Sequence, residues 1–199
     1  MKKYELTDET LKIGAITLHR IKAVVAFADV SAGETGGWVE KEENLDQAGA
    51  AWVFGDACVF GAARVFGAAR VFGDACVFGA ARVYGAARVF GAARVYGAAR
   101  VFGDACVFGA ASHLEIGPIG SRDDTITFTR DKKGGIYAAI GCFFGTLAEF
   151  REKVGKTHGE NVHAQAYLLA AQLAELRIDT TPVDDGQEQL DKETENDGK

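Results

Sequence analysis

The most regular pattern of apolar and polar positions in this chain is a six-residue repeat that runs from Val53 to Ser112. Ten uninterrupted hexads follow one another, most of them Val-Phe-Gly-Ala-Ala-Arg or Val-Phe-Gly-Asp-Ala-Cys. Six is not a helical period, and a glycine in every hexad would cost a helix about 1 kcal/mol each time. Between the glycines, small or branched residues alternate with large or charged ones, as in a β-strand. The repeat therefore predicts a solenoid of short strands separated by glycine corners.

The alternation inside each hexad assigns its residues to the two surfaces of such a strand. Because arginine belongs in solvent, the alanine and the valine on either side of it point to the interior. In the stretch Ala63-Arg64-Val65-Phe66 the arginine and the aromatic ring then share the outer surface. The predicted core is narrow and built of alanine and valine.

The hexad resembles the hexapeptide repeat of left-handed parallel β-helix proteins. The resemblance implies that three hexads form one triangular coil, so that residues three hexads apart stack at about 4.8 Å, as in any β-sheet. The expected outer columns are the aromatic sets Phe54, Phe72, Phe90 and Phe108; Phe60, Phe78 and Tyr96; and Phe66, Tyr84 and Phe102, and the cationic sets Arg64, Arg82 and Arg100; and Arg70 and Arg88.

These columns are costly if water is their only neighbour. Arginines about 4.8 Å apart repel by about 1 kcal/mol even in water, and the outward rings exceed the apolar patch that a monomer normally exposes. Two interpretations stay open. The ladders stack on themselves and stiffen the rod, or one face is covered by a second protomer, the C-terminal region or a protein partner. The second interpretation gives a binding surface of Arg64, Arg70, Arg82, Arg88, Arg100, Phe72, Tyr84, Phe90 and Tyr96.

Each hexad that ends in cysteine has an aspartate two residues earlier, and the first two such hexads lie three hexads apart. Asp56, Cys58, Asp74 and Cys76 should therefore cluster on one outer face. Two carboxylates and two thiols are ligands for a soft divalent metal, whereas the alternative is ordinary surface variation. A Cys58–Cys76 disulfide is conceivable in geometry but is not expected in a reducing compartment. No cofactor is expected.

The chain divides into four segments by pattern. The predicted segments are an N-terminal β cap at 1–46, the solenoid at 47–112, an α+β module at 113–178 and an acidic disordered tail at 179–199. The tail holds eight acidic and two basic residues and so carries the whole net charge of −6. The fold class is therefore mainly β, a left-handed parallel β-helix solenoid with a cap and a small C-terminal module.

The C-terminal module is expected to have a ββαα order. Thr125–Thr129 and Ile136–Cys142 alternate as a strand pair. Thr146 and Glu149 form a capping box that opens a helix to about Lys156. A second helix rich in alanine and leucine is predicted over about Asn161–Arg177.

Taken whole, the chain resembles an uncharacterised bacterial and prophage-associated hexapeptide-repeat family over about residues 4–175. The resemblance rests on the hexads, on GETGGWVE within 31–40, and on IGPIGSR, GCFFGTLAEF and THGENVH in the C-terminal module. It implies no established activity. Prophage-borne members suggest a role in phage–host biology.

Catalytic candidates lie outside the repeat. Cys142 with His158 and His163 could form a nucleophile–base pair, although each residue also suits an ordinary structural place. Gly120, Ser121 and Arg122 form a glycine-rich anion-binding candidate. Residues 53–112 hold no histidine and no inserted loop, so His113 is the nearest base for an acyltransferase-like enzyme acting at a subunit interface.

The first functional hypothesis is therefore a non-enzymatic scaffold or binding protein, self-associated or bound to a protein partner. A small-molecule substrate is not indicated. No run of apolar residues is long enough for a membrane span, and no apolar segment follows Lys2 and Lys3, so a cytoplasmic protein is expected. The acidic balance argues against nucleic acid, but the repeat itself carries six arginines against three aspartates, which keeps a polyanion open.

Overall fold

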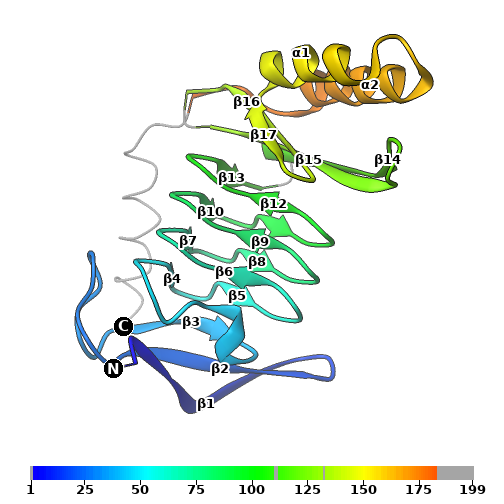
Figure 1. Cartoon of the computed structure of the whole chain (residues 1–199). Helices are drawn as coiled ribbons and strands as arrows, with labels where there is room; N and C mark the ends of the chain where they lie inside the picture. The colour runs from blue at the N-terminus through cyan, green and yellow to red at the C-terminus, as the bar shows by residue number, and fades with distance from the viewer. Residues whose placement is uncertain (1, 110–111, 132, 183–199) are drawn as a thin grey trace.

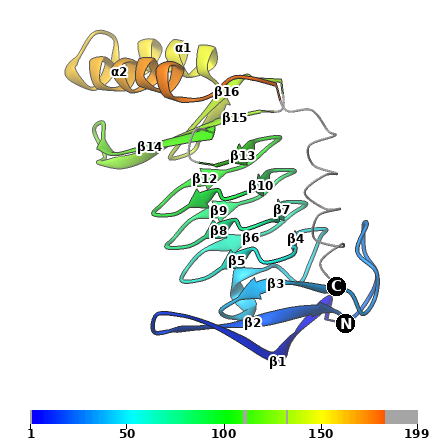
Figure 2. The same ribbon diagram turned by 180° about the vertical axis from the view of Figure 1, so that it is seen from behind.

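The computed structural model describes residues 2–109, 112–131 and 133–182. A stack of short strands forms a parallel β-solenoid, with antiparallel strands at its N-terminal end and a four-stranded sheet with two helices at its C-terminal end (Figures 1 and 2). The helices lie on the side of that sheet that faces away from the solenoid (Figure 1).

The solenoid has three sides, and each side is one parallel sheet. The first joins β3 (Thr35–Val39), β5 (Cys58–Val59), β8 (Cys76–Val77) and β11 (Arg94–Val95). The second joins β4 (Trp52–Val53), β7 (Arg70–Val71), β10 (Arg88–Phe90) and β13 (Cys106–Phe108). The third joins β6 (Arg64–Val65), β9 (Arg82–Val83) and β12 (Arg100–Val101).

The register confirms that residues three hexads apart stack. Arg64 pairs with Arg82 and Arg82 with Arg100 on the third side, while Cys58 pairs with Cys76 on the first. Valine and alanine of successive coils fill the interior, where residues such as Val83 and Ala81 have no exposed surface. The predicted alternation of the hexad is therefore correct for the interior of the rod.

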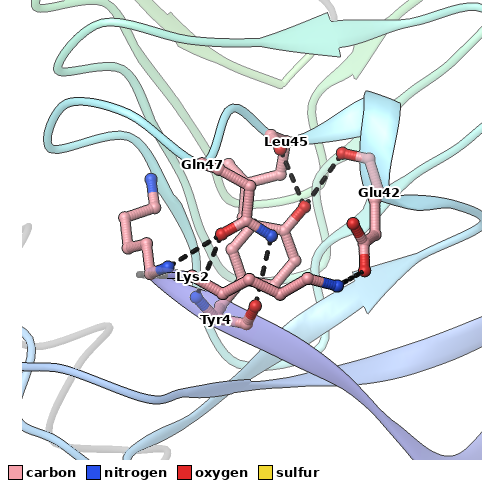
Figure 3. Close-up of polar contacts among 6 residues, drawn as sticks. Lys2, Tyr4, Glu42, Leu45 and Gln47 are labelled. Atoms are coloured by element: carbon pink, nitrogen blue, oxygen red, sulfur yellow. Dashed lines mark hydrogen bonds and ion pairs between the residues drawn. The ribbon is translucent and has the colours of Figure 1, made fainter.

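An antiparallel strand pair closes the N-terminal end. β1 (Tyr4–Ile13) pairs with β2 (Ile16–Ala23), and β2 pairs with β3 at the edge of the first side. Figure 3 shows how the start of β1 is held against residues 42–47, which include the short 3-10 helix η1 (Glu42–Asn44). The hydroxyl of Tyr4 donates to the carbonyls of Glu42 and Leu45 at 2.9 and 2.7 Å, and the Gln47 amide donates to Tyr4 O at 3.1 Å.

The C-terminal module has two more strands than the ββαα order predicts. β14 (His113–Ile119), β15 (Asp124–Arg130), β16 (Ile136–Ile140) and β17 (Phe143–Thr146) form one antiparallel sheet. α1 (Leu147–His158) and α2 (Val162–Arg177) follow. Thr146 caps α1 through the predicted box with Glu149. The apolar core of the module lies between helices and sheet, and Phe128, Phe150 and Tyr167 are in it.

Two arginines help to join the module to the solenoid. The Arg130 guanidinium lies 3.9 Å from the Phe108 ring and donates to the carbonyls of Asp179 and Thr181. Arg100 donates to the carbonyl of Gly141. Of the predicted acidic tail, residues 183–199 lie outside the described part of the chain.

Candidate functional site

The third side of the solenoid carries the most regular surface, which we call the arginine face. It consists of the arginine column Arg64, Arg82 and Arg100 and the ring column Phe66, Tyr84 and Phe102. Successive rings stack with centroids 4.8 Å apart and planes within 4° of parallel. Phe144 and Tyr137 of the C-terminal sheet continue the ring column beyond Phe102.

The arginines of this face differ in exposure and in their hydrogen-bond and ion-pair partners. Arg100 is half-buried and engaged with Gly141, whereas Arg64 and Arg82 are exposed. Within the described part of the chain, neither Arg64 nor Arg82 forms an ion pair. Two cations in register on neighbouring coils thus lie beside a row of partly exposed rings.

The second side does not offer the contact residues that its sequence predicts. Phe72 and Phe90 are only 3% and 4% exposed, because they stack between Phe54 and Phe108 in one apolar cluster. Arg70 forms a two-pronged ion pair with Asp29 at 2.6 and 2.7 Å. Arg88 of the same column is half-buried. The expectation of an exposed binding surface is therefore wrong for Phe72 and Phe90.

On the first side, Phe60, Phe78 and Tyr96 stack with centroids 5.1 and 5.5 Å apart. Tyr96 is the most exposed ring of the column, with half of its surface accessible. It also borders a cleft at the point where the solenoid meets the C-terminal module. This cleft is the second candidate site.

The cleft has a volume of about 340 Å³ and is formed by three elements. β11 and the residues beside it form one wall, the start of β14 forms another, and the last residue of α2 closes the third. Its lining consists of Ala92, Arg94, Tyr96, His113, Leu114, Glu115 and Arg177. His113 and Glu115 share one face of β14 because they lie two residues apart on the strand.

The two ionisable residues of β14 are held in a poorly hydrated position. Burial raises the pKa of Glu115 to about 7, opposed by a hydrogen bond from the backbone at Tyr96. Burial also lowers the pKa of His113, opposed by a hydrogen bond to the backbone at Arg94. One buried atom of each side chain, Nδ1 of His113 and Oε1 of Glu115, has no hydrogen-bond partner among the described residues. At neutral pH the imidazole of His113 is therefore mostly neutral, and the carboxyl group of Glu115 is partly protonated and partly ionised.

Among the residues that line the cleft, sequence reasoning named His113 as a candidate base and Tyr96 as part of the outer binding surface. Glu115 lies in a strand that was not predicted, and Arg94 and Arg177 come together with it only through the docking of the module. Whether His113 acts in acyl transfer, as the alternative hypothesis expects, stays a prediction.

The four residues of the candidate metal cluster do not assemble. The carboxylate of Asp56 faces Arg20 at 3.1 Å and the Trp38 indole at 3.4 Å, and Asp74 is exposed. In the described residues no group of three or more histidine, cysteine or acidic side chains could hold a metal ion. The two thiols do lie side by side, since Cys58 pairs with Cys76 and both are free.

The thiol pair gives a first testable prediction. A hydrogen bond with Cys58, helped by Arg94, lowers the pKa of Cys76 to about 7 from an ordinary 9.0, while the same contact raises the pKa of Cys58. Thiolate is the reactive form, so we expect iodoacetamide to label Cys76 with a midpoint near neutral pH, measured by mass spectrometry. In Cys58→Ala the midpoint should rise. An ordinary midpoint for Cys76 in both proteins would contradict the assignment.

The catalytic candidates Cys142, His158 and His163 are not among the residues that line the cleft beside Tyr96. Cys142 is exposed in the turn between β16 and β17. The rings of His158 and His163 pack against each other, with centroids 6.2 Å apart, and His158 also contacts Tyr167. The structure thus brings the two histidines together, and whether Cys142 acts with either of them stays a prediction.

The predicted anion-binding loop is the turn between β14 and β15. Gly120 has a φ of +78° and lies against the Tyr167 ring, so close that a Cβ would overlap the hydroxyl. Ser121 and Arg122 are exposed. The glycine thus serves the packing of α2 on the sheet, and anion binding at this turn stays a prediction.

No helix in the described residues has the length and apolar character needed to cross a membrane.

Comparison with known proteins identifies no relative of this chain. No protein-family model matches the sequence, and no curated protein matches it significantly.

Proposed function

We propose that this chain is a non-enzymatic binding protein whose arginine face docks an acidic protein surface. The observation that carries the proposal is the pair of exposed arginines in register, Arg64 and Arg82, without ion-pair partners in the described part of the chain. Guanidinium groups favour carboxylates because they offer paired donors. A partner carboxylate between the two would replace their mutual repulsion by attraction.

The rigidity of the face supports this role. Each arginine projects from a strand whose backbone is bonded to the coils on either side, and the neighbouring rings stack at 4.8 Å. A rigid surface loses little conformational freedom when it binds. Aromatic rings and arginine are also the residues most enriched at the energetic centre of protein interfaces.

Charge favours a different protein over a second copy on this face. Two copies that met through their arginine faces would bring like-charged columns together, and such contacts are unfavourable. Glutamates one helical turn apart place their Cβ atoms about 5–6 Å from each other, close to the coil repeat of about 4.8 Å. An acidic helix on the partner therefore fits the ladder. Self-association through the arginine face is the other outcome that the experiment must separate.

The experiment compares the chain with an Arg64→Gln/Arg82→Gln double variant by affinity capture and mass spectrometry. Host bacterial extract is the first source of partners, given the resemblance to a prophage-associated family. We expect the double variant to lose a specific acidic protein, and titration with that purified protein should show binding about tenfold to hundredfold weaker. Rising salt should weaken the wild-type complex, because the paired charges are near the surface.

Arg94→Gln is the matched control, because Arg94 has the same place in its hexad but lies on the first side of the solenoid. It should retain the captured protein. Equal capture by all three proteins, or a dimer in sedimentation that the double variant abolishes, would overturn the proposal.

A further inference from the structure

The cleft between β11, β14 and α2 has features that protein docking on the arginine face does not use. It brings two arginines, Arg94 and Arg177, to the same hollow as the half-buried pair His113 and Glu115. It also lies on a different side of the solenoid from Arg64 and Arg82. The cleft and the arginine face are therefore separate sites.

Two polar atoms of β14 in this cleft have no protein partner among the described residues. They are Oε1 of Glu115 and Nδ1 of His113, and both atoms are buried. A buried polar group is normally paired with a protein atom, an ordered water or an ion, because leaving it unpaired is unfavourable. A molecule in the hollow could supply both partners.

The cations of the cleft define the charge of that molecule. Neither Arg94 nor Arg177 forms an ion pair within the described residues, and both are exposed at the rim. A guanidinium group pairs with a carboxylate or a phosphate through parallel hydrogen bonds. A hollow of about 340 Å³ is at the lower end of the range for small-molecule sites.

We infer that this cleft binds a small oxyanion, a carboxylate or a phosphate group, with Arg94 and Arg177 neutralising its charge and Glu115 and His113 hydrogen-bonding to it from β14. Protonated Glu115 donates to the anion through its carboxyl O–H. Neutral His113 offers a ring nitrogen as a donor or an acceptor. No covalent step is involved.

The carboxyl group of Glu115 makes this binding dependent on pH. The charged or titratable groups that face it in the cleft are Arg94, Tyr96, His113 and Arg177. Below pH 7 Glu115 is mostly neutral and can donate, whereas above pH 7 it becomes a carboxylate that repels the anion. A bound anion favours the protonated form, so binding takes up a proton, and affinity should fall as pH rises through 7.

The test uses NMR titration of the full chain with sodium acetate and with inorganic phosphate, and acetamide serves as the neutral counterpart of acetate. We expect an anion to shift resonances of β11 and β14 with millimolar affinity, about 10 mM or tighter, and acetamide to have no effect. Acetate alone would assign a carboxylate site, and phosphate alone a phosphate site. Either result supports the inference.

Substitutions then locate the site. Arg94→Gln and Arg177→Gln should each weaken binding about tenfold, while Arg82→Gln, at the same hexad position on the arginine face, should leave it unchanged. Glu115→Gln should keep binding and lose the fall in acetate affinity between pH 6 and pH 8. Thermal melting of each variant checks that it folds.

Three results would overturn the inference. They are no saturable shifts with either anion, equal loss in Arg82→Gln and Arg94→Gln, or an unchanged pH dependence in Glu115→Gln. A failure of anion binding in the cleft would not contradict protein docking on the arginine face. The two proposals are tested by different variants, because Arg94→Gln is the control for docking and Arg82→Gln is the control for anion binding.

Discussion

Val83→Asp is expected to unfold the solenoid. Val83 has no exposed surface and stacks between Val65 and Val101 in an interior made of alanine and valine. A carboxylate there would lose its hydration and meet no partner, which costs about 5 kcal/mol or more, comparable with the whole stability of a typical domain. Circular dichroism during urea denaturation would show the loss.

Arg82→Asp is the matched control for this change. Arg82 is the preceding residue of β9, but its side chain is exposed on the arginine face. The same carboxylate should therefore cost about 1 kcal/mol or less. If Val83→Asp and Arg82→Asp were equally stable, the assignment of valine to the interior would be wrong.

Gly85→Ala is expected to cause the second large loss of stability. Gly85 forms a corner with a φ of +74°, and a Cβ there would lie 2.8 Å from the backbone nitrogen of Gly103 on the next coil. Left-handed backbone costs a non-glycine residue about 1–2 kcal/mol, and the overlap with rigid backbone adds to it. We expect about 3 kcal/mol in total, measured as a lower urea midpoint.

Gly91→Ala separates the two contributions. Gly91 has a similar φ of +61°, but no atom of the described residues lies within 4 Å of a Cβ at this corner. Its alanine variant should lose only the conformational part, about 1 kcal/mol. Equal losses at Gly85 and Gly91 would mean that the corners of successive coils do not pack as closely as the structure has them.

The repeat explains why so much of the solenoid is predictable. Once Val59 and Ala63 are assigned to the interior, the same pattern places every equivalent residue. The stacking of Phe66 on Tyr84 follows from the coil of three hexads that the resemblance implies. The helices of the module are predictable for a local reason, since Thr146 and Asn161 cap them. The hexad pattern and the helix caps are both local signals, because each lies within a few residues of the strand or helix that it specifies.

The remaining features depend on contacts between segments that are far apart in the sequence. β14 was not predicted because Gly117 and Pro118 interrupt its alternation, and its partner strand supplies the ladder. Phe72 is buried whereas Tyr84 is partly exposed, although the two rings have the same place in their hexads. The cleft combines residues from β11, β14 and α2, so its charge and volume arise only when the module docks.

The most direct test of the proposed binding role is an NMR titration of the chain with a designed acidic helix. The peptide carries glutamates at i and i+4, and a second peptide carries glutamines there. We predict saturable shifts at Arg64, Arg82 and Tyr84 with the glutamate peptide, none with the glutamine peptide, and loss of the shifts in Arg64→Gln/Arg82→Gln. Equal shifts with both peptides, or binding that the double variant retains, would contradict the account.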